Sequence, residues 1–382
     1  MPQEKIFDTG KVKINYLDSG SPSAEPLVML HGGAWRWQEY LSLIPSLSQR
    51  WHVYAMDLRG NGRSEWVAGH YRLEDFAEDI VTFLRQLDAP AVLVGHSLGG
   101  AIALMAAAQC PEKVKALIIE DSPLDLDTYK NVVDSSRDMF GLWLELKKSA
   151  SSEKELSLAL ADKYKDYPGV TSQWILFFAG CLWALDPTYF DALLYDFNGF
   201  TKGYGAEEIM AKIKCPVLFI RGETKLGAIM TDEEISRLKR DFSNVNDVQI
   251  SGVGHLLHLQ GVRREVARPQ YAPRLGCRAA QSEVHPQALD RTFLRSIAGC
   301  GAPGSRAQPV QLVRDQVAQQ PADHPLARPR RLVDPLGVEA DGHRVQRDED
   351  IVVQRSCVAD AAQRGAHRVG GHQCDVHVMP PP

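Results

Sequence analysis

A serine between two glycines is the feature of this sequence best suited to chemistry. It lies in Gly95-His96-Ser97-Leu98-Gly99, between an apolar run that predicts a strand and an Ala- and Leu-rich run that predicts a helix. A serine hydroxyl is a weak nucleophile at neutral pH, so acyl transfer needs it on a sharp exposed turn, beside a base and beside donors for the developing oxyanion. The flanking glycines permit such a turn, and the pattern therefore predicts that Ser97 is a nucleophile.

A candidate base lies late in the chain. His255 ends the segment Ser251-Gly252-Val253-Gly254-His255, directly after a short predicted strand over 248–250. The two glycines would let this loop carry the imidazole to Ser97. His258, three residues further on, is the alternative base.

The surrounding elements must position these side chains. Helical spacing of apolar residues predicts an amphipathic helix over 73–87, and an apolar run predicts a buried helix over 98–108. Strands and helices alternate, which predicts an α/β fold with a mostly parallel sheet covered on both faces. The predicted strands are 12–16, which reads as a half-buried edge strand, 26–30, 51–56, 91–94, 116–119, 216–220 and 248–250.

A long insert without strand signals separates two of these strands. It contains helix-like stretches over 156–164 and 174–183. Because a structureless loop of this length is uncommon in a compact domain, we predict a helical cap over about 124–212, above the open end of the sheet. Its apolar side chains would line a pocket, or would form the core of the cap itself. The aromatic candidates for either place are Trp174, Phe177, Phe178 and Trp183.

Three motifs in this order resemble the α/β-hydrolase superfamily, in particular its capped, soluble esterase-like and lactonase-like members. They are His31-Gly32-Gly33-Ala34-Trp35, Asp57-Leu58-Arg59-Gly60-Asn61-Gly62-Arg63-Ser64 and Gly95-His96-Ser97-Leu98-Gly99-Gly100. The resemblance covers residues 10–260. It implies the α/β-hydrolase fold, a mostly parallel sheet flanked by helices with a helical cap insert, and it indicates little about the substrate.

The resemblance also implies roles for backbone amides. In the family, the turn after His-Gly supplies one oxyanion donor, which maps to Gly33 with Ala34 as the alternative. The residue after the nucleophile, here Leu98, supplies the other. The base directly follows a Gly-x-Gly turn, which favours His255 over His258. We expect His31, Asp57 and Arg59 to be structural residues.

The acid of the triad must accept the second N–H of the imidazole and hold its tautomer. Many family members place an Asp a few residues after the strand 217–220, but Lys225 stands there in this chain. In a subgroup of the family the acid instead ends the preceding strand, which favours Asp121. Glu120 and Glu223 remain alternatives.

These residues together predict hydrolysis of a small apolar carboxylic ester, thioester or lactone through an acyl-enzyme. The Ser97 nucleophile argues against the chemistry of the epoxide hydrolases and haloalkane dehalogenases of the family, which use an Asp. Two alternatives remain open: carbon–carbon bond hydrolysis of a diketone-like substrate with the same triad, and a lactone receptor without efficient turnover.

Composition narrows the remaining possibilities. The 382 residues carry a net charge of −5, with no apolar run long enough to cross a bilayer and no signal peptide. We therefore expect a cytoplasmic protein with no nucleic-acid partner, no membrane association, no cofactor and no metal. The seven cysteines are scattered without a Cys-x-x-Cys pair and are expected to be free thiols.

The composition changes abruptly near Gln260. Residues 1–260 contain 16 Lys and 10 Arg against 35 acidic residues, whereas residues 261–382 contain no Lys, 17 Arg, 13 acidic residues and no Trp. Clear apolar periodicity ends at the same point. We predict a hydrolase domain over 1–260 and a tail over 261–382 that is either disordered or an out-of-frame or fused reading of a GC-rich stretch.

Overall fold

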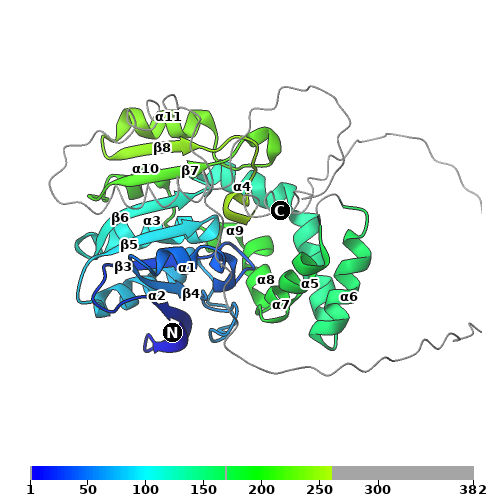
Figure 1. Ribbon diagram of the computed structural model, residues 1–382. Coiled ribbons are helices and arrows are strands. Elements are labelled where there is room, and N and C mark those ends of the chain that lie inside the picture. The colour runs from blue at the N-terminus through cyan, green and yellow to red at the C-terminus, as the bar shows by residue number, and fades with distance from the viewer. Residues whose placement is uncertain (1, 168–169, 260–382) are drawn as a thin grey trace, which may run out of the picture. The chain divides into compact units, whose positions relative to one another are not determined.

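The computed structural model describes residues 2–167 and 170–259. The strands found there form one sheet in the order β1-β2-β4-β3-β5-β6-β7-β8 (Figure 1). The pairs β1–β2 and β2–β4 are antiparallel, and the other neighbours are parallel. The predicted α/β fold with a mostly parallel sheet is confirmed. The strands are Gln3–Asp8 (β1), Lys13–Ser19 (β2), Pro26–Leu30 (β3), His52–Met56 (β4), Ala91–His96 (β5), Val114–Glu120 (β6), Val217–Arg221 (β7) and Val245–Gln249 (β8).

The helices cover the sheet and form the insert between β6 and β7. The α-helices are Ile44–Leu47 (α1), Leu73–Gln86 (α2), Leu98–Gln109 (α3), Leu126–Ser135 (α4), Arg137–Ser149 (α5), Glu153–Tyr164 (α6), Ser172–Trp183 (α7), Thr188–Tyr195 (α8), Phe197–Phe200 (α9), Ala206–Met210 (α10) and Asp232–Asp241 (α11). Short 3-10 helices are Trp37–Tyr40 (η1), Pro111–Lys113 (η2) and Thr224–Leu226 (η3).

Both faces of the sheet are buried, as a parallel sheet requires. Side chains alternate between the two faces along a strand. On β3, Val28 and Leu30 belong to one hydrophobic cluster together with α2 and α3, while Leu27 and Met29 belong to a second cluster together with α1. The continuous apolar run of β3 therefore reflects burial on both sides.

The parallel strands bring their carboxyl ends to one edge of the sheet. The segments that follow β3, β5, β6 and β8 contain, respectively, His31, Ser97, Asp121 and His255. Because these strands run in the same direction, the residues that follow them gather at the same edge. The sheet thus places the predicted site where the ends of four strands meet.

The insert is helical, with α4 to α10 between β6 and β7 in the described part of the chain. Figure 1 shows α5, α6, α7 and α8 packed together as a group. Within this group Phe178 is fully buried and stacks on Trp174, with ring centroids 4.9 Å apart. Phe177 and Phe178 both lie against Trp35, which follows β3, with centroids 5.5 and 5.6 Å apart. Trp174 and Phe178 are therefore buried side chains of the helical insert, and Phe178 also contacts the segment after β3. The role of the insert as a cap and the lining of a substrate pocket stay predictions.

Three features differ from the sequence prediction. The strand over 12–16 is not at the edge, because β1 pairs with β2 along its whole length. β1 itself was not predicted, since most of its side chains are exposed and it lacks an alternating apolar pattern. α11 was also not predicted. The predicted tail over 261–382 lies outside the described residues.

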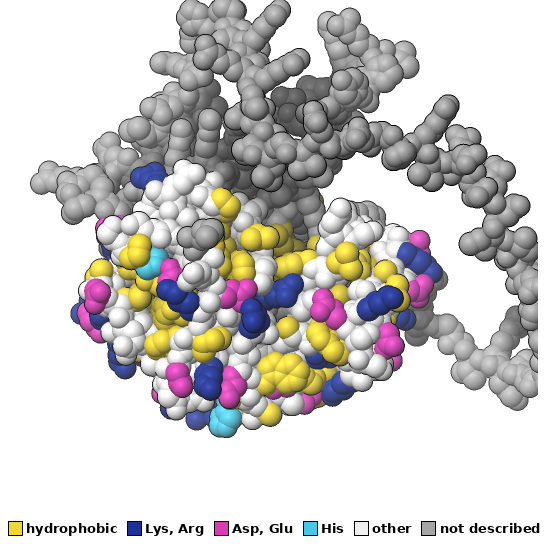
Figure 2. Space-filling model, turned by 60° about the horizontal axis from the view of Figure 1, so that its bottom comes forward, with side chains coloured by type: hydrophobic (Ala, Val, Ile, Leu, Met, Phe, Trp, Pro, Cys, Tyr) yellow, Lys and Arg dark blue, Asp and Glu magenta, His cyan; other side chains and the backbone are white. Residues whose placement is uncertain are grey.

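The described surface mixes charges of both signs. Figure 2 shows one face on which acidic and basic side chains are interspersed among hydrophobic ones. None of the helices within residues 2–167 and 170–259 has the length and apolar composition needed to cross a membrane.

Candidate active site

Ser97 occupies a sharp turn between β5 and α3. Its backbone has φ 51° and ψ −117°, and its N–H donates a 2.9 Å hydrogen bond to the carbonyl of Glu120 on β6. A β-carbon at Gly95 would lie 2.3 Å from the carbonyl oxygen of Gly99, and one at Gly99 would lie 2.1 Å from that of Leu30. Only glycine fits at both positions, which explains the spacing around the serine.

His255 and Asp121 are in direct contact. The Nδ1 atom of His255 lies 2.8 Å from Oδ2 of Asp121, which is fully buried, while the imidazole retains 19% exposure. The backbone N–H groups of Ile229 and Met230 donate to the same carboxylate at 2.9 and 3.0 Å. Four groups thus fix one geometry, in which Nδ1 of His255 faces the carboxylate and Nε2 makes no hydrogen bond to a described residue.

The loop of His255 lies against the turn of Ser97. His96, the residue before the serine, donates from Nε2 to the carbonyl of His255 at 3.1 Å, and the two imidazole rings have centroids 4.7 Å apart. The loop of the candidate base is therefore held against the turn of Ser97 in two ways. His96 donates a hydrogen bond to its backbone, and the rings of His96 and His255 are in contact.

Two backbone amides beside the serine lack acceptors. In the part of the chain that the structure describes, neither Gly33 nor Leu98 donates a hydrogen bond from its backbone N–H. Leu98 is the first residue of α3, where an N–H has no partner within the helix. A β-carbon at Gly33 would lie 3.9 Å from the side chain of Leu98, so the two segments are adjacent. The N–H of Ala34 likewise has no acceptor there, so this alternative donor stays open.

The alternative base and one alternative acid contact each other. Nδ1 of His258 lies 2.6 Å from Oε1 of Glu120, and both side chains are almost fully buried. Glu223 accepts a 2.9 Å hydrogen bond from the N–H of Gly252 in the base loop and pairs with Lys225 at 2.8 Å. Of the candidates weighed from the sequence, His255 and Asp121 form the pair whose imidazole is partly exposed.

The expected structural residues hold the loops around the site. His31 donates from Nδ1 to the carbonyl of Gly32 at 2.7 Å and accepts the N–H of Leu58 on Nε2 at 3.0 Å. Asp57 accepts the backbone N–H of Trp37 at 2.8 Å. These bonds occupy both polar sides of His31, so it is not available as a base in this arrangement.

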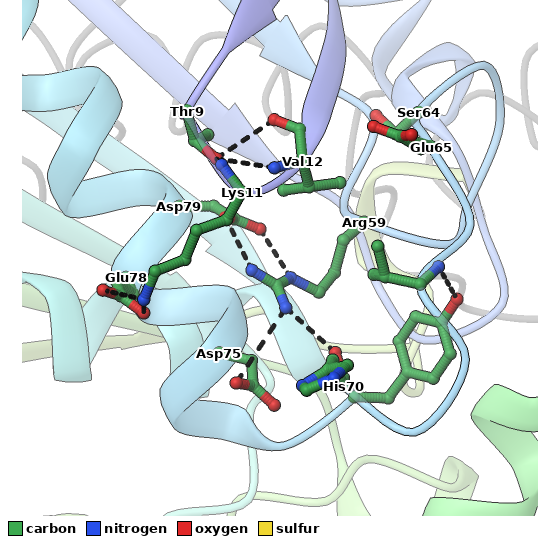
Figure 3. Close-up of polar contacts among 12 residues, drawn as sticks. Thr9, Lys11, Val12, Arg59, Ser64, Glu65, His70, Asp75, Glu78 and Asp79 are labelled. Atoms are coloured by element: carbon green, nitrogen blue, oxygen red, sulfur yellow. Dashed lines mark hydrogen bonds and ion pairs between the residues drawn. The ribbon is translucent and has the colours of Figure 1, made fainter.

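Arg59 connects the loop after β4 to α2. Figure 3 shows its guanidinium between Asp79 and the backbone of His70. Nε and Nη2 of Arg59 each lie 2.7 Å from one carboxylate oxygen of Asp79, and Nη1 donates to the carbonyl of His70 at 3.0 Å. Both charged side chains are buried, and burial, which outweighs Arg59, raises the pKa of Asp79.

Sequence reasoning missed two residues that contact this site. The hydroxyl of Tyr189 on α8 lies 2.8 Å from the position of a β-carbon at Gly33, so a side chain from the insert reaches the predicted oxyanion turn. Glu39, in η1, accepts the N–H of Gly32 at 2.9 Å and is fully buried. No motif marks either residue, because both act through contacts between distant segments.

No metal site was found in the described chain, where no group of three or more His, Cys, Asp or Glu side chains is arranged to hold an ion. The polar groups at the carboxyl ends of the strands pair with one another instead.

Known proteins resemble this chain in sequence. The family model described as alpha/beta hydrolase fold matches residues 25–262. Over 168 residues the chain is 30% identical to the 2-(acetamidomethylene)succinate hydrolase of Mesorhizobium japonicum, covering 42% of this chain and 56% of that protein. It is 32% identical over 117 residues to the dihydrolipoyllysine-residue acetyltransferase component of the acetoin cleaving system of Pseudomonas putida, covering 30% of this chain and 32% of that protein.

Solved structures share the fold. That of an enzyme degrading N-acyl homoserine lactones superposes with a TM-score of 0.52 at 24% identity, covering 69% of this chain and 98% of that one. At this identity the likeness is one of fold.

Proposed function

The chain belongs to the alpha/beta hydrolase fold family, and on that premise we propose that it is a serine hydrolase of a small carboxylic ester, thioester or lactone. In this proposal Ser97 is the nucleophile, His255 the base and Asp121 the residue that orients the base. The backbone amides of Gly33 and Leu98 bind the oxyanion.

The proposed reaction passes through an acyl-enzyme. Nε2 of His255 takes the hydroxyl proton as Oγ of Ser97 attacks the acyl carbon, and the negative charge that develops on the carbonyl oxygen is met by the two amides. The imidazolium returns its proton to the leaving alcohol, thiol or ring oxygen, so that the acyl–oxygen or acyl–sulfur bond breaks. Water, deprotonated by the same imidazole, then releases the acid and restores Ser97.

The observation that carries this proposal is the 2.8 Å contact from Nδ1 of His255 to buried Asp121, in a loop held against the turn of Ser97. A carboxylate next to Nδ1 fixes the tautomer of the imidazole, so that Nε2 is the nitrogen that can accept a proton. The named activity of the Mesorhizobium japonicum relative, a hydrolase, supports hydrolysis as the class of reaction.

The test is active-site labelling of the full chain. A fluorophosphonate probe should label the parent protein, which should also hydrolyse a short-chain p-nitrophenyl ester. Ser97→Ala and His255→Ala should abolish both signals. Matched controls are Ser135→Ala and His70→Ala, because both side chains are exposed, and each should behave like the parent. A folded parent that is neither labelled nor active would overturn the proposal.

A further inference from the structure

Four ionisable side chains form a buried chain of contacts behind the proposed site. They are Glu39, His96, Glu120 and His258, and none of their side chains is more than 3% exposed. Oε1 of Glu39 pairs with Nδ1 of His96 and lies 3.3 Å from Nε2 of His258. Nδ1 of His258 in turn lies 2.6 Å from Oε1 of Glu120. The order of contact is therefore imidazole, carboxylate, imidazole, carboxylate.

Three of the four members lie within three residues of a proposed catalytic group in the chain. His96 precedes Ser97, Glu120 precedes Asp121, and His258 lies three residues after His255. His96 donates from Nε2 to the carbonyl of His255 at 3.1 Å.

Glu39 and Glu120 also accept from the backbone. Glu39 accepts the N–H of Gly32, the neighbour of the oxyanion residue Gly33, at 2.9 Å. Glu120 accepts the N–H of His258 at 3.1 Å. The four side chains thus connect the oxyanion turn, the nucleophile turn, the acid and the base loop.

The contacts indicate the charge of each group. Each of the two imidazoles has an oxygen atom next to both ring nitrogens, an arrangement that favours the doubly protonated, positively charged ring. Burial alone would lower the pKa of His258, but Glu120 and Glu39 outweigh it and raise the pKa to about 10. Burial is likewise outweighed by Glu39 at His96, whose pKa is raised. Two imidazoliums then balance two carboxylates.

The carboxylates show the opposite effect. Burial would raise the pKa of Glu39 and of Glu120, but the neighbouring imidazoliums outweigh it and lower both. Other titratable groups against the cluster are Tyr40, whose ring lies 5.2 Å from that of His258, and His255, whose ring lies 4.7 Å from that of His96. Burial lowers the pKa of His31, and the nearby charge of Glu39 opposes this shift.

We propose that Glu39, His96, Glu120 and His258 form a positioning network that holds the base loop and the oxyanion turn in register with Ser97. The inference rests on the proposed function. Buried charge pairs contribute little net stability compared with apolar packing, but in some proteins they fix one specific geometry. Glu39 is its central member, because its carboxylate contacts three of the four segments.

The first test is Glu39→Gln in the full chain. The amide can still accept from Gly32 but presents no charge to the imidazoliums. Displacement of a catalytic group by about 1 Å can lower turnover by about 100-fold. We therefore expect kcat for ester hydrolysis and the rate of fluorophosphonate labelling to fall by about that factor, with KM changed by less than about threefold. The control is Asp18→Asn, which removes the carboxylate 2.7 Å from His52 on β4, at the opposite end of the parallel strands. It should leave kcat unchanged.

A second measurement does not depend on activity or on the variant folding. In 15N-histidine NMR spectra of the parent at about pH 8, two histidines should show both ring nitrogens protonated, although free imidazole is neutral there. Folded Glu39→Gln protein with the kcat of the parent would overturn the network, and so would a parent without two such imidazoliums. A parent with them but without labelling would overturn the proposed hydrolase and leave the charged cluster intact.

Discussion

Backbone strain concentrates at the residues assigned to the proposed site. Among described residues other than glycine, positive φ occurs at Ala34 (61°), Ser97 (51°) and Asp121 (40°). Each such conformation costs about 1–3 kcal/mol and persists only where the surroundings enforce it. These three residues are the alternative oxyanion donor, the proposed nucleophile and the proposed acid. The strain therefore gives independent support for the site from geometry alone.

Substitutions distinguish Asp121 from Glu223 as the acid of the triad. Asp121→Asn keeps the shape but places an amide against Nδ1 of His255, which favours the wrong tautomer. We expect kcat to fall about 10⁴-fold, as when a triad acid is replaced by its amide. Glu223→Gln should lower kcat by less than about tenfold. Glu223 accepts the N–H of Gly252 in the base loop, and the amide oxygen of Gln can accept the same hydrogen bond. Steady-state hydrolysis of one ester by both variants checks this, and the reverse ranking would assign the acid to Glu223.

The sequence could name the candidates at this scale but could not orient them. Glu120 and Asp121 are adjacent at the end of β6, and consecutive side chains point to opposite sides of a strand. In the structure Glu120 meets His258 while Asp121 meets His255. That choice depends on the positive φ of Asp121 and on contacts with a loop 134 residues away, neither of which leaves a local pattern.

At the scale of elements, the insert and the sheet meet at the oxyanion turn. The φ of Gly33 lies outside the left-handed region, so the backbone itself would accept alanine there. The obstacle is Tyr189, whose hydroxyl lies 2.8 Å from the new β-carbon and whose ring is packed against buried Phe190. The hydroxyl cannot easily withdraw.

This contact predicts a rescue. Relief of this contact would shift the proposed oxyanion amide, and a misplacement of about 1 Å can cost about 100-fold in rate, so Gly33→Ala should lower kcat/KM by about 10-fold or more. Adding Tyr189→Phe removes the clashing oxygen and should restore most of the loss, while Tyr189→Phe alone serves as the reference. Values of kcat/KM for the three variants check the prediction. A double variant as impaired as Gly33→Ala would contradict this account of the contact.

The buried pair of Arg59 and Asp79 connects a loop to a helix and should behave as a unit (Figure 3). Removing one partner leaves an uncompensated buried charge, so Arg59→Ala and Asp79→Ala should each lower the free energy of unfolding by about 3–5 kcal/mol. The combined change Arg59→Met with Asp79→Leu should cost clearly less than the two losses added.

Urea unfolding measures these differences. The control is Glu78→Gln on the same helix, which breaks the exposed pair with Lys11 and should cost no more than about 1 kcal/mol. Additive losses at Arg59 and Asp79 would show that the two charges do not act together.

Element prediction succeeded where apolar periodicity was strong and failed where other signals carried the structure. The strand predicted over 26–30 matches β3, and the predicted helix over 73–87 matches α2 to within a residue. α11 has few apolar residues and begins instead with a capping box, in which Thr231 and Glu234 bond each other's backbone N–H. That signal was present in the sequence. β1 left none, because it depends on pairing with β2.

At the scale of the whole chain, the family match ends where the composition changes. The match stops at residue 262, and residues 261–382 contain 17 Arg and no Lys. Translating the coding DNA in all frames past codon 260 distinguishes the two interpretations of 261–382. An amphipathic helical segment in another frame would identify a frame change, and its absence would identify a natural extension.

The buried network also predicts how stability depends on pH. The pKa of His258 is raised from an ordinary 6.5 to about 10, so its contribution is complete below about pH 6.5 and is lost as the pH rises toward 10. His96 shifts in the same direction. Glu39 and Glu120 are shifted below their ordinary 4.5, so their contribution is complete above that value and is lost as the pH falls. The network therefore stabilises the fold most between about pH 4.5 and 6.5.

Comparison with Glu39→Gln isolates this effect from other titrating groups. Above about pH 6.5 the folded parent binds more protons than the unfolded chain. Folded Glu39→Gln, which lacks one carboxylate of the network, should bind about one proton fewer than the folded parent. Each proton changes the free energy of unfolding by about 1.4 kcal/mol per pH unit. The parent should thus be much more stable than Glu39→Gln at about pH 6, and the gap should narrow toward pH 9. Reversible urea unfolding at several pH values, with equal m-values for both proteins, measures the gap. A gap independent of pH would mean that Glu39 stabilises the fold by packing, without the two imidazoliums.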